Sequence, residues 1–238
     1  AQRLLLSDSS AGLSASVTVA LRADTLELDF AQDIGAANAA LVVTASQLRA
    51  TSLHGDIHLA SANDLALLGL SAQEGEIGLD IAGHLALAAG AWLDADGITL
   101  EAAGISAATD ARVQSGGRLS LSAQGDIGTA AAPLHLSVAS LSVQSVAGSV
   151  YLGEADGLTL VSASAASGFS LTSRSGSITL AAAARVAADT VTLAAETGTI
   201  IAGSGTGTEA QIIANSLSLS AQGDIGTAAA PLHLSVAS

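Results

Sequence analysis

The feature that most constrains this chain is an exact internal repeat. The segment from Leu119 to Ser140, LSLSAQGDIGTAAAPLHLSVAS, returns without a change as Leu217 to Ser238. A degenerate third copy begins at Leu26 with LELDFAQDIGAANAALVVTASQL. Long repeats of this kind are typical of architectures in which similar structural units stack and contact only their neighbours.

The repetition extends beyond the copied segment. At a constant offset of 93 residues, Leu48 matches Leu141 and Gly55 matches Gly148. We therefore divide the chain into long repeats at approximately 26–118 and 119–216, with a partial repeat at 217–238. We expect residues 1–238 to form a single continuous segment of one repeat architecture, and we interpret that segment as a fragment of a longer chain.

Short runs within the repeats alternate apolar and polar residues, as in SLSLSA, LHLSVA and SITLA. Alternation with a period of two predicts β-strands, and Gly-containing turns separate the runs. The polar positions are mostly Ser and Thr, so we expect these to face outwards. The aliphatic positions would then form an interior ladder that includes Leu121, Ile127, Leu136, Val150 and Leu152.

A second landmark places an aliphatic residue shortly after a Gly, or after a Gln in one case. Its members are Ile34, Ile57, Leu85, Ile105, Ile127, Val150, Ile178, Ile200 and Ile225. Their spacings repeat every four steps, so one long repeat contains four short units of about 24 residues. A unit of this length with two or three strands and Gly-rich corners predicts one coil of an all-β, parallel β-solenoid. The chain would hold about ten coils.

Composition agrees with such a narrow interior. Half of the residues are apolar, yet only four are aromatic, so small and branched side chains must fill the core. The formal net charge is −14 and every basic residue is an Arg, which disfavours nucleic acid and anionic membranes as partners. There is no cysteine for a disulfide or a thiolate metal site. No apolar run approaches the ~20 residues of a membrane-spanning helix, so we predict no membrane insertion.

Helix is the competing interpretation at two places. Ala181 to Ala188 and Leu85 to Ala91 consist of good helix formers. Both segments follow an alternating strand-like run at matching places in the long repeat. We therefore expect an alanine-lined corner of the solenoid at each place.

The motifs GDIG at 125–128 and 223–226, QDIG at 32–35 and GDIHL at 55–59 occur with flanking runs such as LSLSAQ. Together they resemble the repeat region of filamentous-haemagglutinin-type proteins, which are two-partner-secreted adhesins and exoproteins of Gram-negative bacteria. The resemblance covers essentially the whole chain. It implies a right-handed parallel β-helix that an outer-membrane transporter exports to the cell surface, where it acts as a stalk, an adhesin or a biofilm scaffold.

Several polar residues are candidate ligands. His54 and His58 lie four apart, but a strand does not give them the geometry of a helical metal pair. His135 and His233 occupy one repeat position and are expected to point outwards. Asp94, Asp96 and Glu101 form too sparse a set for a usual calcium site. The Gly-rich stretch from Gly203 to Glu209 lacks the Lys of a phosphate-binding loop, so we interpret it as a corner loop.

Catalysis is not predicted. A β-helix lyase or hydrolase needs clustered carboxylates with a basic or acidic partner, whereas Arg112, Arg118, Arg174 and Arg185 are scattered among Ser and Ala. A unique active site would also have no reason to be copied with its scaffold. We therefore predict no catalytic, cofactor-binding or metal-binding residue and no enzymatic activity.

The predicted function is that of a structural segment of an extracellular bacterial adhesin, secreted or at the cell surface. The alternative is a face of the β-helix that binds a polysaccharide or a receptor, and an enzyme of the β-helix class is a third. Ser238 corresponds to Ser140, after which the earlier copy continues directly. We therefore expect coils at the ends of the segment to associate end to end with another copy.

Overall fold

The computed structural model describes residues 2–14, 21–203 and 211–237, and all regular structure within these ranges is β-strand. The strands are parallel and stack as a β-solenoid of about ten turns, which confirms the predicted fold class. The chain divides into two compact units, Ala1–Gly117 and Arg118–Ser238. The division nearly coincides with the predicted boundary between long repeats. Among the described residues, no helix is long and apolar enough to cross a membrane.

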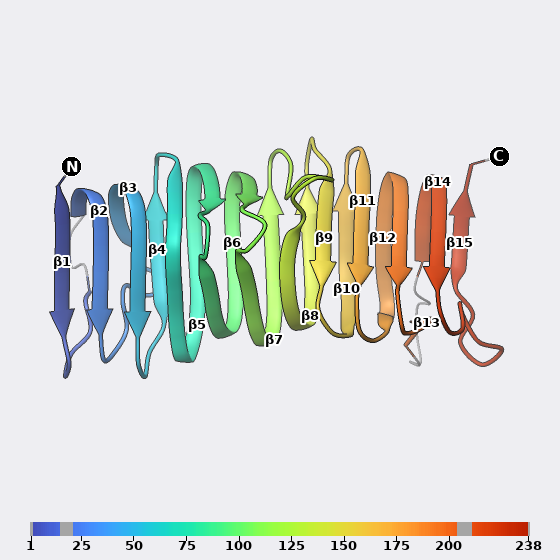
Figure 1. Ribbon diagram of the computed structural model, residues 1–238, viewed down its shortest axis with the longest axis horizontal. Coiled ribbons are helices and arrows are strands. Elements are labelled where there is room, and N and C mark those ends of the chain that lie inside the picture. The colour runs from blue at the N-terminus through green and yellow to red at the C-terminus, as the bar shows by residue number, and fades with distance from the viewer. Residues whose placement is uncertain (1, 15–20, 204–210, 238) are drawn as a thin grey trace. The chain divides into compact units, whose positions relative to one another are not determined.

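The first unit contains strands β1 (Arg3–Asp8), β2 (Leu21–Phe30), β3 (Leu41–Ser52), β4 (Ile57–Ser61), β5 (Leu65–Leu87) and β6 (Trp92–Ala107). Each pairs in parallel with the next, and β3 also pairs with β5 (Figure 1). Strand β7 (Arg112–Ala123) contains the boundary between the units. The long strands β5 and β6 bend through more than one face of a coil, because register shifts interrupt their pairing.

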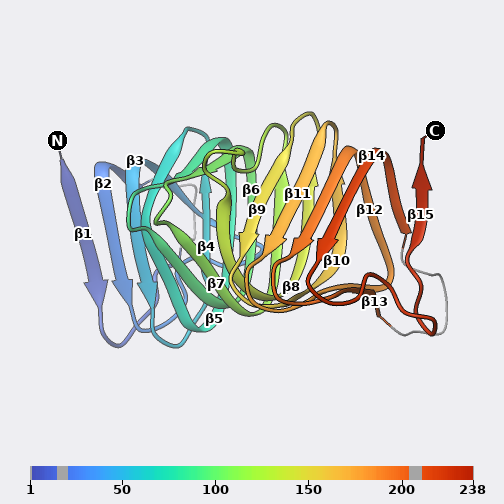
Figure 2. The same cartoon turned by 45° about the vertical axis from the view of Figure 1, so that its right-hand side comes forward.

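The second unit continues with β8 (Leu134–Ser145), β9 (Val150–Glu154), β10 (Leu158–Ala165), β11 (Gly168–Ser173), β12 (Ile178–Ala195), β13 (Ile200–Ala202), β14 (Gln211–Ala221) and β15 (His233–Val236). One row of pairing runs from β8 through β9, β11, β12 and β14 to β15 (Figure 2). Strand β10 pairs with β8 and β12, and β13 pairs with β12. Long strands such as β12 therefore contribute to several faces of the coil.

Parallel register sets the length of each coil. The step along the chain from Leu41 to its partner Leu59 is short, whereas the step from Arg185 to its partner Gln211 is longer. The predicted coil length falls between these two steps, and corners of different length account for the spread. The predicted interior ladder is confirmed, since Leu121, Ile127, Leu136, Val150 and Leu152 are all buried.

The spacing of the aliphatic landmark residues suggested that they occupy the same position in successive coils. The strand pairing shows that they do not. Ile57 pairs with Ile77 rather than with Leu85, and Leu85 instead pairs with Ile105. The long spacing from Ile57 to Leu85 is therefore one full coil, which ends at Ile77, plus a short stretch that carries the chain to its next face. The same shift separates Val150, which pairs with Phe169, from Ile178.

The long repeat, taken from Ile127 to its exact copy Ile225, consequently holds four coils and part of a fifth. In the second unit, one ladder passes through Ile127, Val150, Phe169, Val191 and Leu217, which makes four coil steps from Ile127 to Leu217. The copy of Ile127 is Ile225, which lies beyond Leu217 in the chain and pairs with Ile200 on a different ladder. The two identical segments thus lie on different faces of the solenoid.

Local structure is nevertheless preserved between the copies. The last Gly of each QDIG or GDIG motif has a positive φ, +75° at Gly35, +67° at Gly128 and +70° at Gly226. This left-handed conformation, which favours glycine, turns the chain into a short side loop. Each loop is closed by two reciprocal backbone hydrogen bonds, as between Thr129 and Ala132. The motif therefore encodes a turn, independently of the face on which it lies.

Neither alanine-rich segment is helical, and the predicted corners are confirmed. Ala181–Ala188 lies within β12, which bends at Ala183, a non-Gly residue with a φ of +63°. Leu85 lies among the last residues of β5, which ends at Leu87. A turn follows, in which the N–H of Ala91 donates a hydrogen bond to the carbonyl of Ala88. Alternation therefore outweighed helix propensity, because the strand pairing buries Leu85 and Val186 in the core.

The inward and outward faces of β7 provide a direct test of the core. Leu121 is buried, whereas its neighbour Ser120 is partly exposed. We expect Leu121→Asp to lower the free energy of unfolding by several kcal/mol, because it places an unpaired charge in an aliphatic interior. Ser120→Asp should change it by less than about 0.5 kcal/mol. Urea unfolding followed by circular dichroism measures both, and equal losses would contradict the assigned faces.

Candidate functional site

The aspartates of the GDI motifs link adjacent coils. The Oδ1 atom of Asp33 accepts a hydrogen bond from the N–H of Asp56 (2.9 Å), and Asp56 accepts one from the N–H of Glu76 (2.8 Å). In the second unit, Asp126 accepts from the N–H of Ser149 (2.7 Å). A Cβ at Gly55 would lie 2.5 Å from the backbone nitrogen of Asp33, so this contact requires glycine. The Gly and Asp of this motif therefore have a structural role: the Gly allows two coils to approach closely, and the Asp joins them by a hydrogen bond.

Buried serines make a second kind of link. Ser145 donates to the carbonyl of Gly125 (2.7 Å) and accepts from the N–H of Gly148 (3.0 Å). Ser52 makes the same pair of bonds in the first unit. Contrary to the expectation that serines cover the outside, Ser52, Ser61, Ser71, Ser115, Ser142, Ser145 and Ser173 are buried. Five of them alternate in phase with inward aliphatic residues, so the alternation itself carried the signal for the inward position of Ser52, Ser61, Ser115, Ser145 and Ser173. Ser71 and Ser142 instead lie between two buried neighbours, and the alternation gave no such signal there.

Glu154 is the one charged residue that is fully buried among the described residues, and it was not singled out from the sequence. It lies in phase with Val150 and Leu152 on β9, so its side chain enters the interior. Its Oε1 accepts from the N–H groups of Val138 and Asp156 (3.3 Å each), while Oε2 has no partner within the described chain. The pKa of Glu154 is raised to about 7, chiefly by burial and to a smaller extent by the charge of Asp156, against the opposing effect of these hydrogen bonds.

The outer surface around Tyr151 carries two adjoining hollows, one of about 320 Å³ and one of about 540 Å³. Both are lined by Tyr151 on β9 and Ser170 on β11. The smaller adds His135, Arg174 and Glu196, and its wall is the side loop that follows the first GDIG motif. The larger adds hydroxyl side chains from Ser149, Ser167, Thr190 and Thr192 and the carboxylate of Asp189. We call the two hollows together the tyrosine groove.

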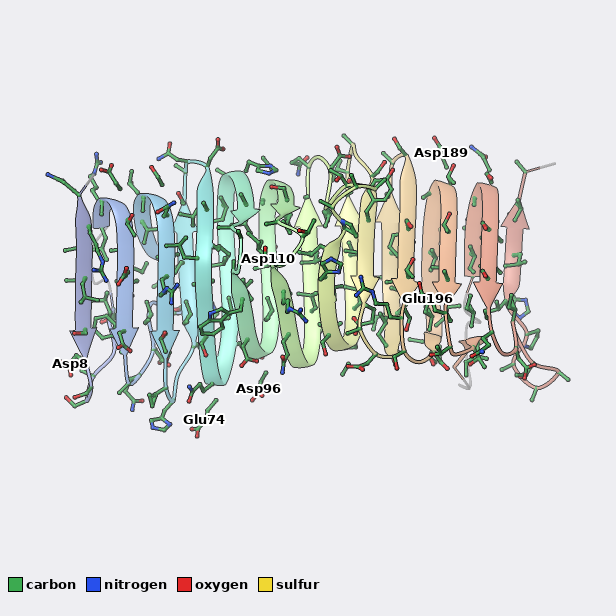
Figure 3. The ribbon with its side chains drawn as sticks, in the orientation of Figure 1. Asp8, Glu74, Asp96, Asp110, Asp189 and Glu196 are labelled. Atoms are coloured by element: carbon green, nitrogen blue, oxygen red, sulfur yellow. The ribbon has the colours of Figure 1, made fainter. Side chains whose placement is uncertain are left out.

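Strand pairing brings these residues together from three coils. Ser170 pairs with Tyr151 on one side and with Thr192 on the other, so their outward side chains form a row across the coils. Asp189 and Glu196 lie on either side of the part of β12 that pairs with β11. Figure 3 shows them at opposite ends of that stretch. No hydrogen bond or ion pair engages the side chains of Tyr151, Arg174 or Glu196 within the described part of the chain. Polar groups of both charges therefore remain available at this surface.

The candidate ligands identified in the sequence do not come together as a metal-binding set in the described residues. His54 binds Glu74 (2.9 Å between Nδ1 and Oε2), while His58 lies 3.8 Å from its neighbour Asp56. No group of three or more His, Cys, Asp or Glu side chains that could hold a metal occurs in residues 2–14, 21–203 and 211–237.

The other candidates are distributed over several elements. Asp94, Asp96 and Glu101 are exposed along β6. His135 and His233 are partly exposed and alternate with leucines. Arg112, Arg118 and Arg185 lie outside the tyrosine groove, and only Arg174 lines it. Of the stretch from Gly203 to Glu209, residues 204–209 lie outside the described residues.

Comparison of the chain with protein-family models, with curated proteins and with solved structures found no match. The family resemblance read from the repeat motifs therefore stays a prediction.

The buried carboxyl predicts an unusual dependence of stability on pH. In the unfolded chain Glu154 has the ordinary pKa of 4.5, whereas in the folded chain its pKa is about 7. Between these values the folded state keeps a proton that the unfolded state releases, so stability falls as pH rises. The loss from pH 5 to pH 8 should be roughly 3 kcal/mol.

Urea unfolding at pH 5, 6, 7 and 8 checks this expectation. Glu154→Gln keeps the shape without the titrating proton, so its stability should be nearly constant over that range. Glu196→Gln removes an exposed carboxyl from the same unit and should retain the slope of the unchanged protein. Identical slopes for the unchanged protein and Glu154→Gln would show that Glu154 does not titrate in this range.

Proposed function

We propose that this chain is a structural repeat segment of an extracellular bacterial fibrous adhesin, serving as a stalk or a biofilm-matrix filament without enzymatic activity. The observation that supports the proposal most directly is the way each coil is fastened to the next. Backbone pairing, aliphatic ladders, aspartates and serines all join one coil to its immediate neighbours. Such a segment lengthens by adding coils and needs no other support, which suits a spacer.

Export through the outer membrane is consistent with this architecture. The chain has no cysteine, so no disulfide can lock it before it crosses the membrane. Its contacts run between nearby coils, and a solenoid of this kind folds by adding coils to those already formed. The family resemblance supplies the expected partner, an outer-membrane transporter of the two-partner type.

An export assay tests this role. The chain is joined to the secretion domain of a two-partner system and produced in a Gram-negative host with and without the matching transporter. We expect transporter-dependent appearance at the cell surface, measured by cleavage of the chain when protease is added to intact cells. Retention inside the cell with the transporter present, while the secretion domain alone is exported, would contradict an extracellular role.

A further inference from the structure

The tyrosine groove carries a second function, which goes beyond the scaffold role and does not depend on it. We propose that the groove formed by β9, β11 and β12 in the second unit binds a neutral oligosaccharide. The hollows of about 320 and 540 Å³ fall in the usual size range of ligand pockets, ~300–1,000 Å³. Tyr151 lies where they meet and can contact a ligand that occupies both.

The lining chemistry favours a sugar. Ser149, Ser170, Thr190 and Thr192 offer hydroxyl groups that both donate and accept hydrogen bonds, as sugar hydroxyls do. The ring of Tyr151 provides an apolar surface with a polar tip, which suits the C–H face of a pyranose. The unengaged side chains of Arg174 and Glu196 add a donor and an acceptor at one end.

Charge distinguishes a neutral from an acidic sugar. Arg174 is the only arginine in the lining, and it lies on the coil next to Glu196, with Asp189 at the other end of the groove. The chain as a whole carries a formal charge of −14, which repels polyanions. A neutral chain of sugars avoids that repulsion and can still form hydrogen bonds with the polar groups of the groove.

A peptide fits this surface less well. Strand β11 pairs with β9 on one side and β12 on the other, so no free backbone edge remains there for strand addition. The large aliphatic and phenyl side chains of the lining, Leu152 and Phe169, are 2% and 1% exposed, so they offer no pocket for an apolar anchor. The remaining apolar residues, Ala130 and Pro133, are small.

The first long repeat does not contain the set of residues that forms the tyrosine groove in the second unit. At the constant offset that relates the long repeats, Tyr151 corresponds to His58 and His135 to Val42 in the first unit. Tyr151, Arg174 and Glu196 all lie outside the exactly copied segments. The copied segment supplies the wall of the groove and His135, and residues outside the copied segments supply its other polar contacts. His58 is therefore a matched control for Tyr151.

The chain contains a single Tyr and a single Trp, which makes NMR titration unambiguous. The protein is labelled on its Tyr and Trp rings and titrated to millimolar concentration with cellohexaose, maltohexaose, laminarihexaose, chitohexaose and hexagalacturonic acid. We expect at least one neutral hexaose to shift the Tyr151 ring signal to saturation and to leave Trp92, in the first unit, unchanged. No saturable shift with any neutral hexaose, an equal shift at Trp92, or a response to hexagalacturonic acid alone would overturn the proposal.

Variants then assign the binding to the groove. With the hexaose that gives the shift, Tyr151→Ala should weaken the affinity measured by calorimetry about tenfold, since it removes the ring contact. Arg174→Ala should also weaken it, and because this side chain is exposed, it tests the groove even where Tyr151→Ala unfolds the protein. His58→Ala should bind like the unchanged chain. Unchanged affinity in Arg174→Ala and in a folded Tyr151→Ala would overturn the assignment.

Discussion

Parallel pairing of each strand with the preceding coil is the constraint on which both units depend. Paired strands lie ~4.8 Å apart, so every aliphatic side chain packs against its counterpart one coil on. The same closeness excludes a Cβ at Gly55 and brings the carboxylate of Asp33 to the N–H of Asp56. It also aligns the outward side chains of Tyr151 and Ser170, from which the tyrosine groove is built.

The sequence predicted the strands and the core well because both depend on a local period of two. Alternation around Leu121 and Val150 identifies inward residues without knowledge of their partners. It could not show that Leu85 and Ile57 belong to different ladders, because that depends on corner lengths which vary from coil to coil. The same variation moves Ile225 to a ladder different from that of Ile127, although the two copies are identical.

The polar interior and the groove were missed for different reasons. Glu154 and Ser145 occupy inward positions of the alternating pattern, so the pattern contained both. Serine was expected to face outwards because of its residue type, and Glu154 was not singled out. The groove gathers residues from Ala130 to Glu196, which only the register brings together. Within the second unit, these are the places where the chain departs from a uniform ladder, and they carry its pH dependence and its proposed ligand.

The register of the second unit is the central claim, and cysteine pairs test it most directly because the chain has none of its own. Thr192 pairs with Ser218 across one coil, so Thr192→Cys with Ser218→Cys places two thiols on paired residues whose Cα atoms are ~4.8 Å apart, within disulfide range. Thr192→Cys with Ser220→Cys separates the Cα atoms by ~8 Å, beyond that range. Rapid oxidation of the first pair alone, measured by mass spectrometry of the folded protein, is the predicted result. Equal oxidation of both pairs, or of the second alone, would contradict the register.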